Sequence, residues 1–115
     1  MIASFQFMAQ TTILEKLKEE LRKIEGMLTA LESEKRKIDE EYSAALSEEN
    51  RIFEEMRRCR DQYRYHQLEM RLNAVSRRRK EIESKRDEIE RKIKGYSEEK
   101  AKLQMRIEYL KPKTQ

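Results

Sequence analysis

The side chains best suited to binding a partner gather near the midpoint of this 115-residue chain. Arginine makes paired hydrogen bonds with carboxylates and phosphates, and arginine and tyrosine contribute heavily to protein interfaces. The candidate partner-binding residues here are Arg57, Arg58, Arg60, Tyr63, Arg64 and Tyr65. Asp61 is the one acid among residues 57–66, so the stretch has a net charge of +3. It suits an acidic protein, a phosphate group or single-stranded nucleic acid. An equally strong interpretation is that Tyr65 closes a core layer against Cys59 while the arginines stay solvated.

Catalytic or metal chemistry has little support in the sequence. The chain has one histidine, His66, and one cysteine, Cys59, with no glycine-rich loop. They are seven residues apart and share a helix face, but two ligands are too few for a zinc site. We therefore predict no catalytic, cofactor-binding or metal-binding residue and no enzymatic activity. A single cysteine cannot form an intrachain disulfide, which favours a reducing compartment.

A second basic string, Ser76 to Lys80, reads Ser-Arg-Arg-Arg-Lys. It resembles a nuclear localisation signal or a phosphate-binding patch. The stronger interpretation is structural, because Arg79 falls on an apolar seam and Arg78 has a predicted acidic partner. We expect weak or no binding to nucleic acid and a cytoplasmic rather than nuclear location.

The first fourteen residues carry no charge and include Ile2, Phe5 and Phe7. They lack the basic start of a signal peptide, and no apolar run reaches the roughly 18 residues of a membrane span. We expect an intracellular protein whose residues 1–11 form an apolar overhang that docks onto a partner or associates end to end. A disordered terminus is the alternative.

Composition and periodicity together indicate long helices. The chain is 43% charged and 37% hydrophobic, with two glycines and one proline. Apolar residues recur at alternating steps of three and four, which is a coiled-coil heptad pattern. The predicted core residues are Leu14, Leu17, Leu21, Ile24, Leu28, Leu31, Ile38, Ile52, Met56, Leu68, Leu72, Val75, Ile82, Ile89, Ile93, Leu103, Ile107 and Leu110. Lys35, Glu49, Arg79, Arg86 and Lys100 interrupt the two seams.

The two seams mirror each other around position 62, so that Leu14 falls opposite Leu110 and Met56 opposite Leu68. They are also out of phase across the midpoint. We predict an all-α antiparallel coiled coil, built as a two-helix hairpin with its turn near residue 62. An antiparallel homodimer of one long helix is the alternative. The predicted segments are an overhang 1–11, helices 12–59 and 66–111, a turn 60–65 and a tail 112–115, with Thr12 capping the first helix.

The charges favour the same antiparallel register. Residues 1–58 hold 10 basic and 13 acidic residues, whereas residues 59–115 hold 17 and 10. An antiparallel arrangement brings flanking positions of opposite charge together. The predicted pairs are Glu20–Arg106, Glu34–Lys92, Glu41–Lys85, Glu48–Arg78 and Glu55–Arg71.

These patterns suggest a non-enzymatic interaction or scaffold protein with protein partners. It would pair its acidic N-terminal half with its basic C-terminal half and present the basic, aromatic midpoint and the apolar N-terminus. It could also form a homo-oligomer. The alternative is a nucleic-acid-binding protein that uses the midpoint and residues 77–80.

Overall fold

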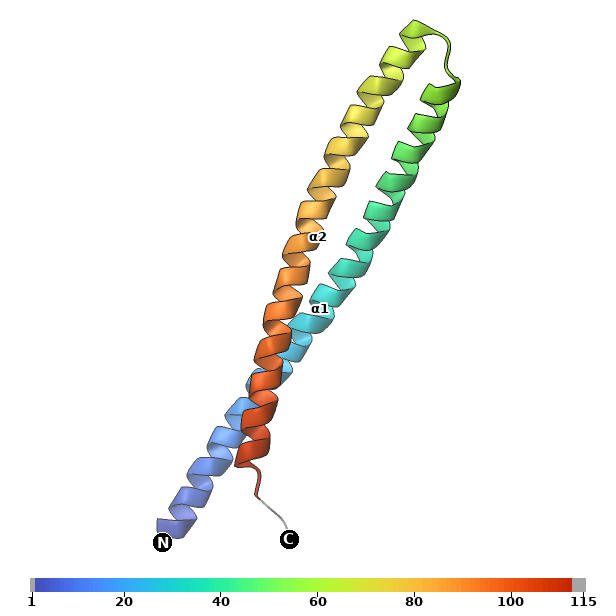
Figure 1. The fold of residues 1–115 in the computed structure, drawn as a ribbon. Helices are drawn as coiled ribbons and strands as arrows, with labels where there is room; N and C mark the ends of the chain where they lie inside the picture. The colour runs from blue at the N-terminus through green and yellow to red at the C-terminus, as the bar shows by residue number, and fades with distance from the viewer. Residues whose placement is uncertain (1, 113–115) are drawn as a thin grey trace. The chain divides into compact units, whose positions relative to one another are not determined.

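The computed structural model describes the backbone of residues 2–112 and the side chains of residue 9 and residues 11–112. Two helices, α1 (Ile2–Arg58) and α2 (Gln62–Leu110), are joined by residues 59–61 (Figure 1). They pack against each other, and the residues described contain no strand. The predicted all-α helical hairpin is confirmed. The alternative of one uninterrupted helix through the midpoint is wrong, because the chain turns at Cys59–Asp61.

The helix ends differ from the predicted ones. Helix α1 already begins at Ile2, so Thr12 lies inside it and does not cap it. Residues 2–11 contain no glycine or proline, and their alanines, glutamines and methionine are good helix formers. The turn is also shorter than the predicted 60–65, since α2 begins at Gln62. At the other end α2 stops at Leu110, two residues before Pro112.

Asp61 makes this short turn without glycine or proline. Its carboxylate Oδ1 accepts a hydrogen bond from the Tyr63 N–H at 3.0 Å, which is N-cap geometry. Its carbonyl accepts the first helical bond of α2, from the Tyr65 N–H at 2.9 Å. The Cys59 N–H donates to the Met56 carbonyl at 3.2 Å and closes the end of α1. No non-glycine residue in the described part of the chain has a positive φ.

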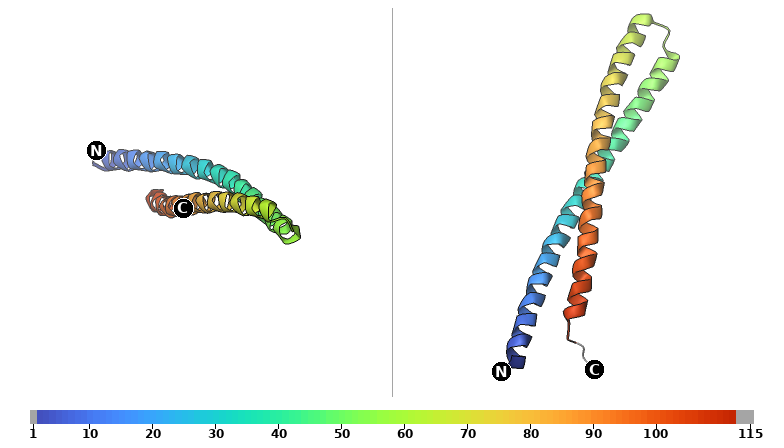
Figure 2. Two further views of the ribbon diagram at one scale, coloured as in Figure 1. Left: turned by 90° about the horizontal axis from the view of Figure 1, so that it is seen from above. Right: turned by 60° about the vertical axis from the view of Figure 1, so that its left-hand side comes forward.

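The chain forms two compact units, each holding a stretch of both helices side by side (Figure 2). Unit 1 comprises Met1–Glu32 and Arg91–Gln115, and unit 2 comprises Ser33–Glu90. In unit 1, Leu17, Leu103 and Ile107 form a buried cluster. Residues from both helices pack around this cluster, namely Leu14, Leu21, Ile24 and Leu110. Leu28 is buried too, and Leu31 and Ile93 are half-buried.

The core of unit 2 follows the same seams. Its buried apolar residues are Ala45, Ile52, Leu68, Ile82 and Ile89. Four further residues of the seams are half-buried, namely Ile38, Met56, Leu72 and Val75. Ile52 is the largest fully buried side chain, with 2% of its surface exposed. Each predicted core residue in the two units is thus buried or half-buried.

Both glycines lie on exposed helical surface. Apart from the backbone of its own helix and its two chain neighbours, a Cβ atom added at Gly26 or Gly95 would meet no atom within 4 Å, and neither residue has a positive φ. Alanine also loses less backbone entropy on folding than glycine. We expect Gly26→Ala and Gly95→Ala each to raise the free energy of unfolding by up to about 1 kcal/mol, measured by urea denaturation. A clear loss of stability in either variant would contradict this placement.

Candidate partner-binding site

The loop brings the predicted midpoint residues together at one end of unit 2, here called the tip (residues 57–66). Arg57 and Arg58 end α1, and Arg60 lies in the loop. Tyr63, Arg64 and Tyr65 stand in the first turn of α2. All six side chains are exposed. The other predicted partner-binding residues, Ile2, Phe5 and Phe7, have their backbone in α1, but their side chains lie outside the described residues.

The tip is positively charged, and most of its arginines have no acidic partner. Arg57 lies 3.3 Å from Glu54, one turn earlier in α1. Arg58, Arg60 and Arg64 form no ion pair with the side chains that the structure describes. The Asp61 carboxylate caps α2 instead of pairing with an arginine. The net charge of +3 on residues 57–66 is therefore available to a bound partner.

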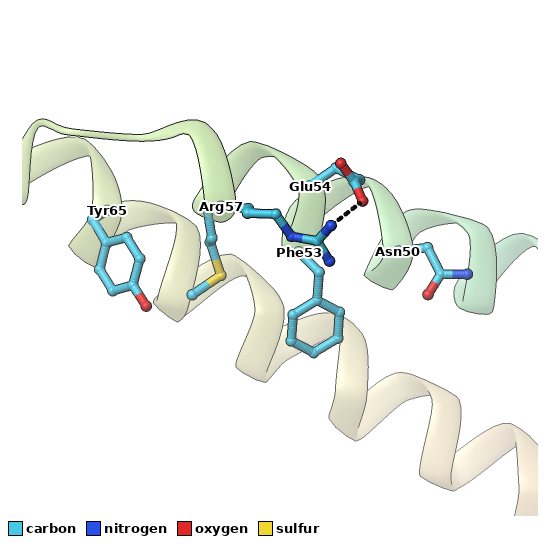
Figure 3. Close-up of a pocket in the computed structure, with 6 residues that line it drawn as sticks. Asn50, Phe53, Glu54, Arg57 and Tyr65 are labelled. Atoms are coloured by element: carbon cyan, nitrogen blue, oxygen red, sulfur yellow. Dashed lines mark ion pairs between the residues drawn. The ribbon is translucent and has the colours of Figure 1, made fainter.

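An open groove lies beside the tip on unit 2 (Figure 3). Phe53 comes from α1 and Tyr65 from α2, and these residues are 49% and 40% exposed. Arg57 spans the space next to them, with its ion pair to Glu54 above the groove in this view. The lining residues are Asn50, Phe53, Glu54, Met56, Arg57 and Tyr65. The groove can thus offer aromatic surface and a guanidinium group to the same ligand.

Phe53 is the aromatic residue of this groove that the seam pattern does not single out. It lies next to Ile52, which is buried, and so falls just outside the apolar seam. Leu46, seven residues earlier on the same side of α1, is also exposed, at 37%. Large apolar residues one heptad apart beside a seam are the signal that could have identified this surface.

The Cys59 and His66 side chains line a second, smaller hollow over the loop, together with Arg60, Asp61 and Gln62. The Cys59 thiol donates a hydrogen bond to the Asp61 carbonyl at 3.3 Å. Among the residues described, no three histidine, cysteine or acidic side chains come together as a metal site.

The basic string 76–80 is divided between surface and interior. Arg79 hydrogen-bonds through Nε to the Glu49 carboxylate, and through Nη1 to Glu83 Oε1 at 2.6 Å. These hydrogen bonds, first that with Glu49 and then that with Glu83, raise the pKa of the Arg79 guanidinium above its usual value. Glu49 is only 8% exposed, so the pair occupies the interface between the helices. Arg77, Arg78 and Lys80 remain exposed.

The other charged residues of the unit 2 seams are also paired across the helices. Arg86 Nε lies 3.0 Å from Asp39 Oδ1, although the two atoms are not aligned as a hydrogen bond. The Arg86 guanidinium also lies 5.1 Å from the centre of the Tyr42 ring, within the range of a cation–π contact. Lys35 Nζ lies 3.8 Å from Glu90 Oε1. These contacts hold one register of α1 against α2.

The flanking ion pairs differ from the predicted set, since no described ion pair joins Glu20 to Arg106, Glu41 to Lys85 or Glu48 to Arg78. Arg71 lies 3.5 Å from Glu48, one heptad from its predicted partner Glu55. Both side chains are largely exposed, so several acidic neighbours are within reach of the long arginine side chain.

A second apolar groove lies on unit 1, near the end of α2. It is lined by Ile13, Met105, Arg106, Tyr109 and Leu110. Helix α1 continues beyond the end of α2 next to this groove (Figure 1). The groove therefore adjoins the uncharged N-terminal segment that the sequence marks as a docking surface.

No family model, curated protein or solved structure matches this chain significantly. Neither helix, over the residues described, contains a stretch apolar enough to cross a bilayer.

Proposed function

We propose that this chain is a non-enzymatic interaction or scaffold protein that binds a partner protein at the tip of its hairpin. The observation that carries the proposal is the groove in which exposed Phe53 and Tyr65 lie beside Arg57. Aromatic and arginine side chains contribute most strongly to interface affinity. Arg58 and Arg60, which have no acidic partner among the described side chains, add a long-range attraction for an acidic surface.

The rest of the hairpin serves as the scaffold. The acidic first half and the basic second half form the two arms, and ion pairs such as Arg71–Glu48 join them. The apolar groove of unit 1 and the uncharged N-terminal segment offer a second surface, for another partner or another copy of the chain. We propose an intracellular location because the one cysteine is a free thiol. We favour the cytoplasm over the nucleus because Arg79, in the centre of the basic string, is held by Glu49 and Glu83.

A second candidate function is binding to nucleic acid. The exposed Arg77, Arg78 and Lys80 and the tip arginines favour it. Arg79, however, is held by Glu49 and Glu83 between the helices and is not available to phosphates. Binding that rests on a few phosphate contacts weakens steeply as salt increases.

The test uses a displayed library of 20-residue peptides without structural bias, selected against the whole chain. We expect the selected peptides to lose at least about tenfold in affinity for a variant with alanine at Arg57, Arg60 and Tyr65, because interface energy concentrates in such side chains. These residues are exposed, so the circular dichroism of the variant should match that of the original chain. Met70→Ser, an exposed apolar site of α2 outside the groove, is the matched control and should bind unchanged.

Two outcomes would reject partner-protein binding at the tip. One is the absence of any selected peptide, and the other is equal binding by the triple variant. A labelled 20-nucleotide single-stranded DNA or RNA tests the second candidate in parallel. Micromolar binding that persists at physiological salt and is lost in the triple variant would favour nucleic acid.

A further inference from the structure

Along the side of α1 that faces the groove, the residues change from charged to apolar toward the loop. With Leu14 as heptad position a, position e carries a charge in four successive heptads and then a large apolar residue in two. The charged residues are Lys18, Glu25, Glu32 and Asp39, and the apolar ones are Leu46 and Phe53. A two-stranded coiled coil needs apolar residues only at a and d. A helix that adds a third apolar position packs on more than one neighbour.

Helix α2 covers this third position only in part. Leu46 and Phe53 remain exposed although Ala45 and Ile52, their neighbours in sequence, are buried against α2. Tyr65 extends the same surface on α2. We call the surface formed by Leu46, Phe53 and Tyr65, with Asn50 and Arg57 between them, the Phe53 face.

The part of the Phe53 face around Leu46 carries little charge for so charged a chain. Residues 42–47 of α1 and residues 72–76 of α2 contain no Asp, Glu, Lys or Arg. Ser43, Ser47 and Asn73 are exposed there. Another helix could pack against these small polar groups without removing a charge from water, which is the costly part of burying a polar surface.

The basic residues at the loop end of the Phe53 face determine which kind of partner can bind there. Arg57 projects from its edge, where its ion pair with Glu54 is largely solvent-exposed and so contributes little energy. Arg58, Arg60 and Arg64 follow within the tip. A second copy of the chain, paired side by side in parallel through this face, would add an equally basic tip and repel it. An acidic occupant would neutralise the arginines.

We propose that the Phe53 face binds an acidic amphipathic helix of a partner protein, which packs as a third helix against unit 2. Its apolar side covers Leu46, Phe53 and Tyr65, and its carboxylates reach Arg57 and the other tip arginines. From Leu46 to the tip the face is about four helical turns long, so roughly 14 residues of the partner are enough. This inference rests on the proposed partner-binding function and specifies its ligand.

The experiment uses two displayed peptide libraries and the whole chain. The first library has a helix-forming framework with apolar residues at helical spacing and all other positions varied. The second is identical except for a central proline, which breaks a helix. We expect only the first library to yield binders, and these should carry a net negative charge. Their affinity should fall at least tenfold with Phe53→Ser or with Arg57→Glu. Met70→Ser, an exposed apolar site of the same unit, should bind unchanged.

The outcomes separate this inference from the proposed function. If proline-containing peptides bind equally well and depend on the tip, partner binding stands and the helix is rejected. If neither library yields a binder, both proposals fail. The acidic helix is rejected if the selected peptides carry no net negative charge. It is also rejected if Phe53→Ser leaves their binding unaffected. Light scattering of the chain alone completes the test. If the chain alone has twice the mass of one copy, 14.1 kDa, and Phe53→Ser returns it to the mass of one copy, then a second copy covers the face instead.

Discussion

Replacing Ile52 with alanine is expected to lower the free energy of unfolding by about 2–5 kcal/mol. Ile52 is 2% exposed and is the largest fully buried side chain described. Removing its outer carbons leaves a cavity that the surrounding side chains of the two helices fill only in part. Small domains are stable by only about 5–15 kcal/mol in total, so the loss should be evident in a urea denaturation followed by circular dichroism.

Leu46→Ala is the matched control for this prediction. Leu46 is also an aliphatic residue of α1 in unit 2, but it is 37% exposed and leaves no enclosed cavity when shortened. Its loss of stability should be clearly smaller than that of Ile52→Ala. Equal losses in the two variants would show that the Ile52 layer is not the centre of the unit 2 core.

Replacing Glu49 with alanine is expected to cost roughly 1–3 kcal/mol of stability, because a hydrogen-bonded charge between the helices loses its partner. Glu49 is 8% exposed and accepts the hydrogen bond from Arg79 Nε. The remaining bond of Arg79, to Glu83, comes from its own helix and does not link α2 to α1. Urea denaturation measures the loss directly.

Two variants test whether burial of the pair causes the effect. Glu48→Ala removes the exposed contact with Arg71 and should cost no more than about 1 kcal/mol. Glu49→Gln keeps a hydrogen-bond acceptor but removes the charge, and should fall between the two alanine variants. If Glu48→Ala were as damaging as Glu49→Ala, the buried position of Glu49 would not explain its contribution.

The hairpin could be predicted because the apolar periodicity specifies register as well as helix. Leu17 mirrors Ile107 about position 62, and in the structure both belong to the same buried cluster. The same register also predicts which polar residues of the seams lie near one another. Glu49 and Arg79 fall in adjacent layers of the mirrored register, and they are hydrogen-bonded in the structure.

The helix ends could not be predicted with the same success, because they depend on local hydrogen bonds rather than on periodicity. Thr12 has the sequence of a cap but lies within α1, since nothing in residues 2–11 stops a helix. The bounds of the turn were hard to predict because it contains no glycine. Its loop is instead closed by the side chain of Asp61. A single aspartate among arginines gives only a weak signal of such a cap.

The candidate site was predicted in part. The charge and aromatic content of residues 57–66 are visible in the sequence, and the loop brings them together. Phe53 was missed because it stands beside the seam rather than on it, and only the packing of α1 against α2 shows that it stays half exposed. Arg71 was assigned to Glu55 and lies on Glu48, because exposed long side chains reach several neighbours at similar energy.

The nested pairing of the two helices has a consequence for the order of folding. The contact of Tyr42 with Glu83 closes 41 residues of chain and that of Glu49 with Arg79 closes 30. The cluster of Leu17 with Ile107 closes a far longer segment. Closing a longer loop costs more chain entropy, so unit 2 should form from the turn outward before unit 1. Amide hydrogens near the chain ends should then exchange with solvent fastest.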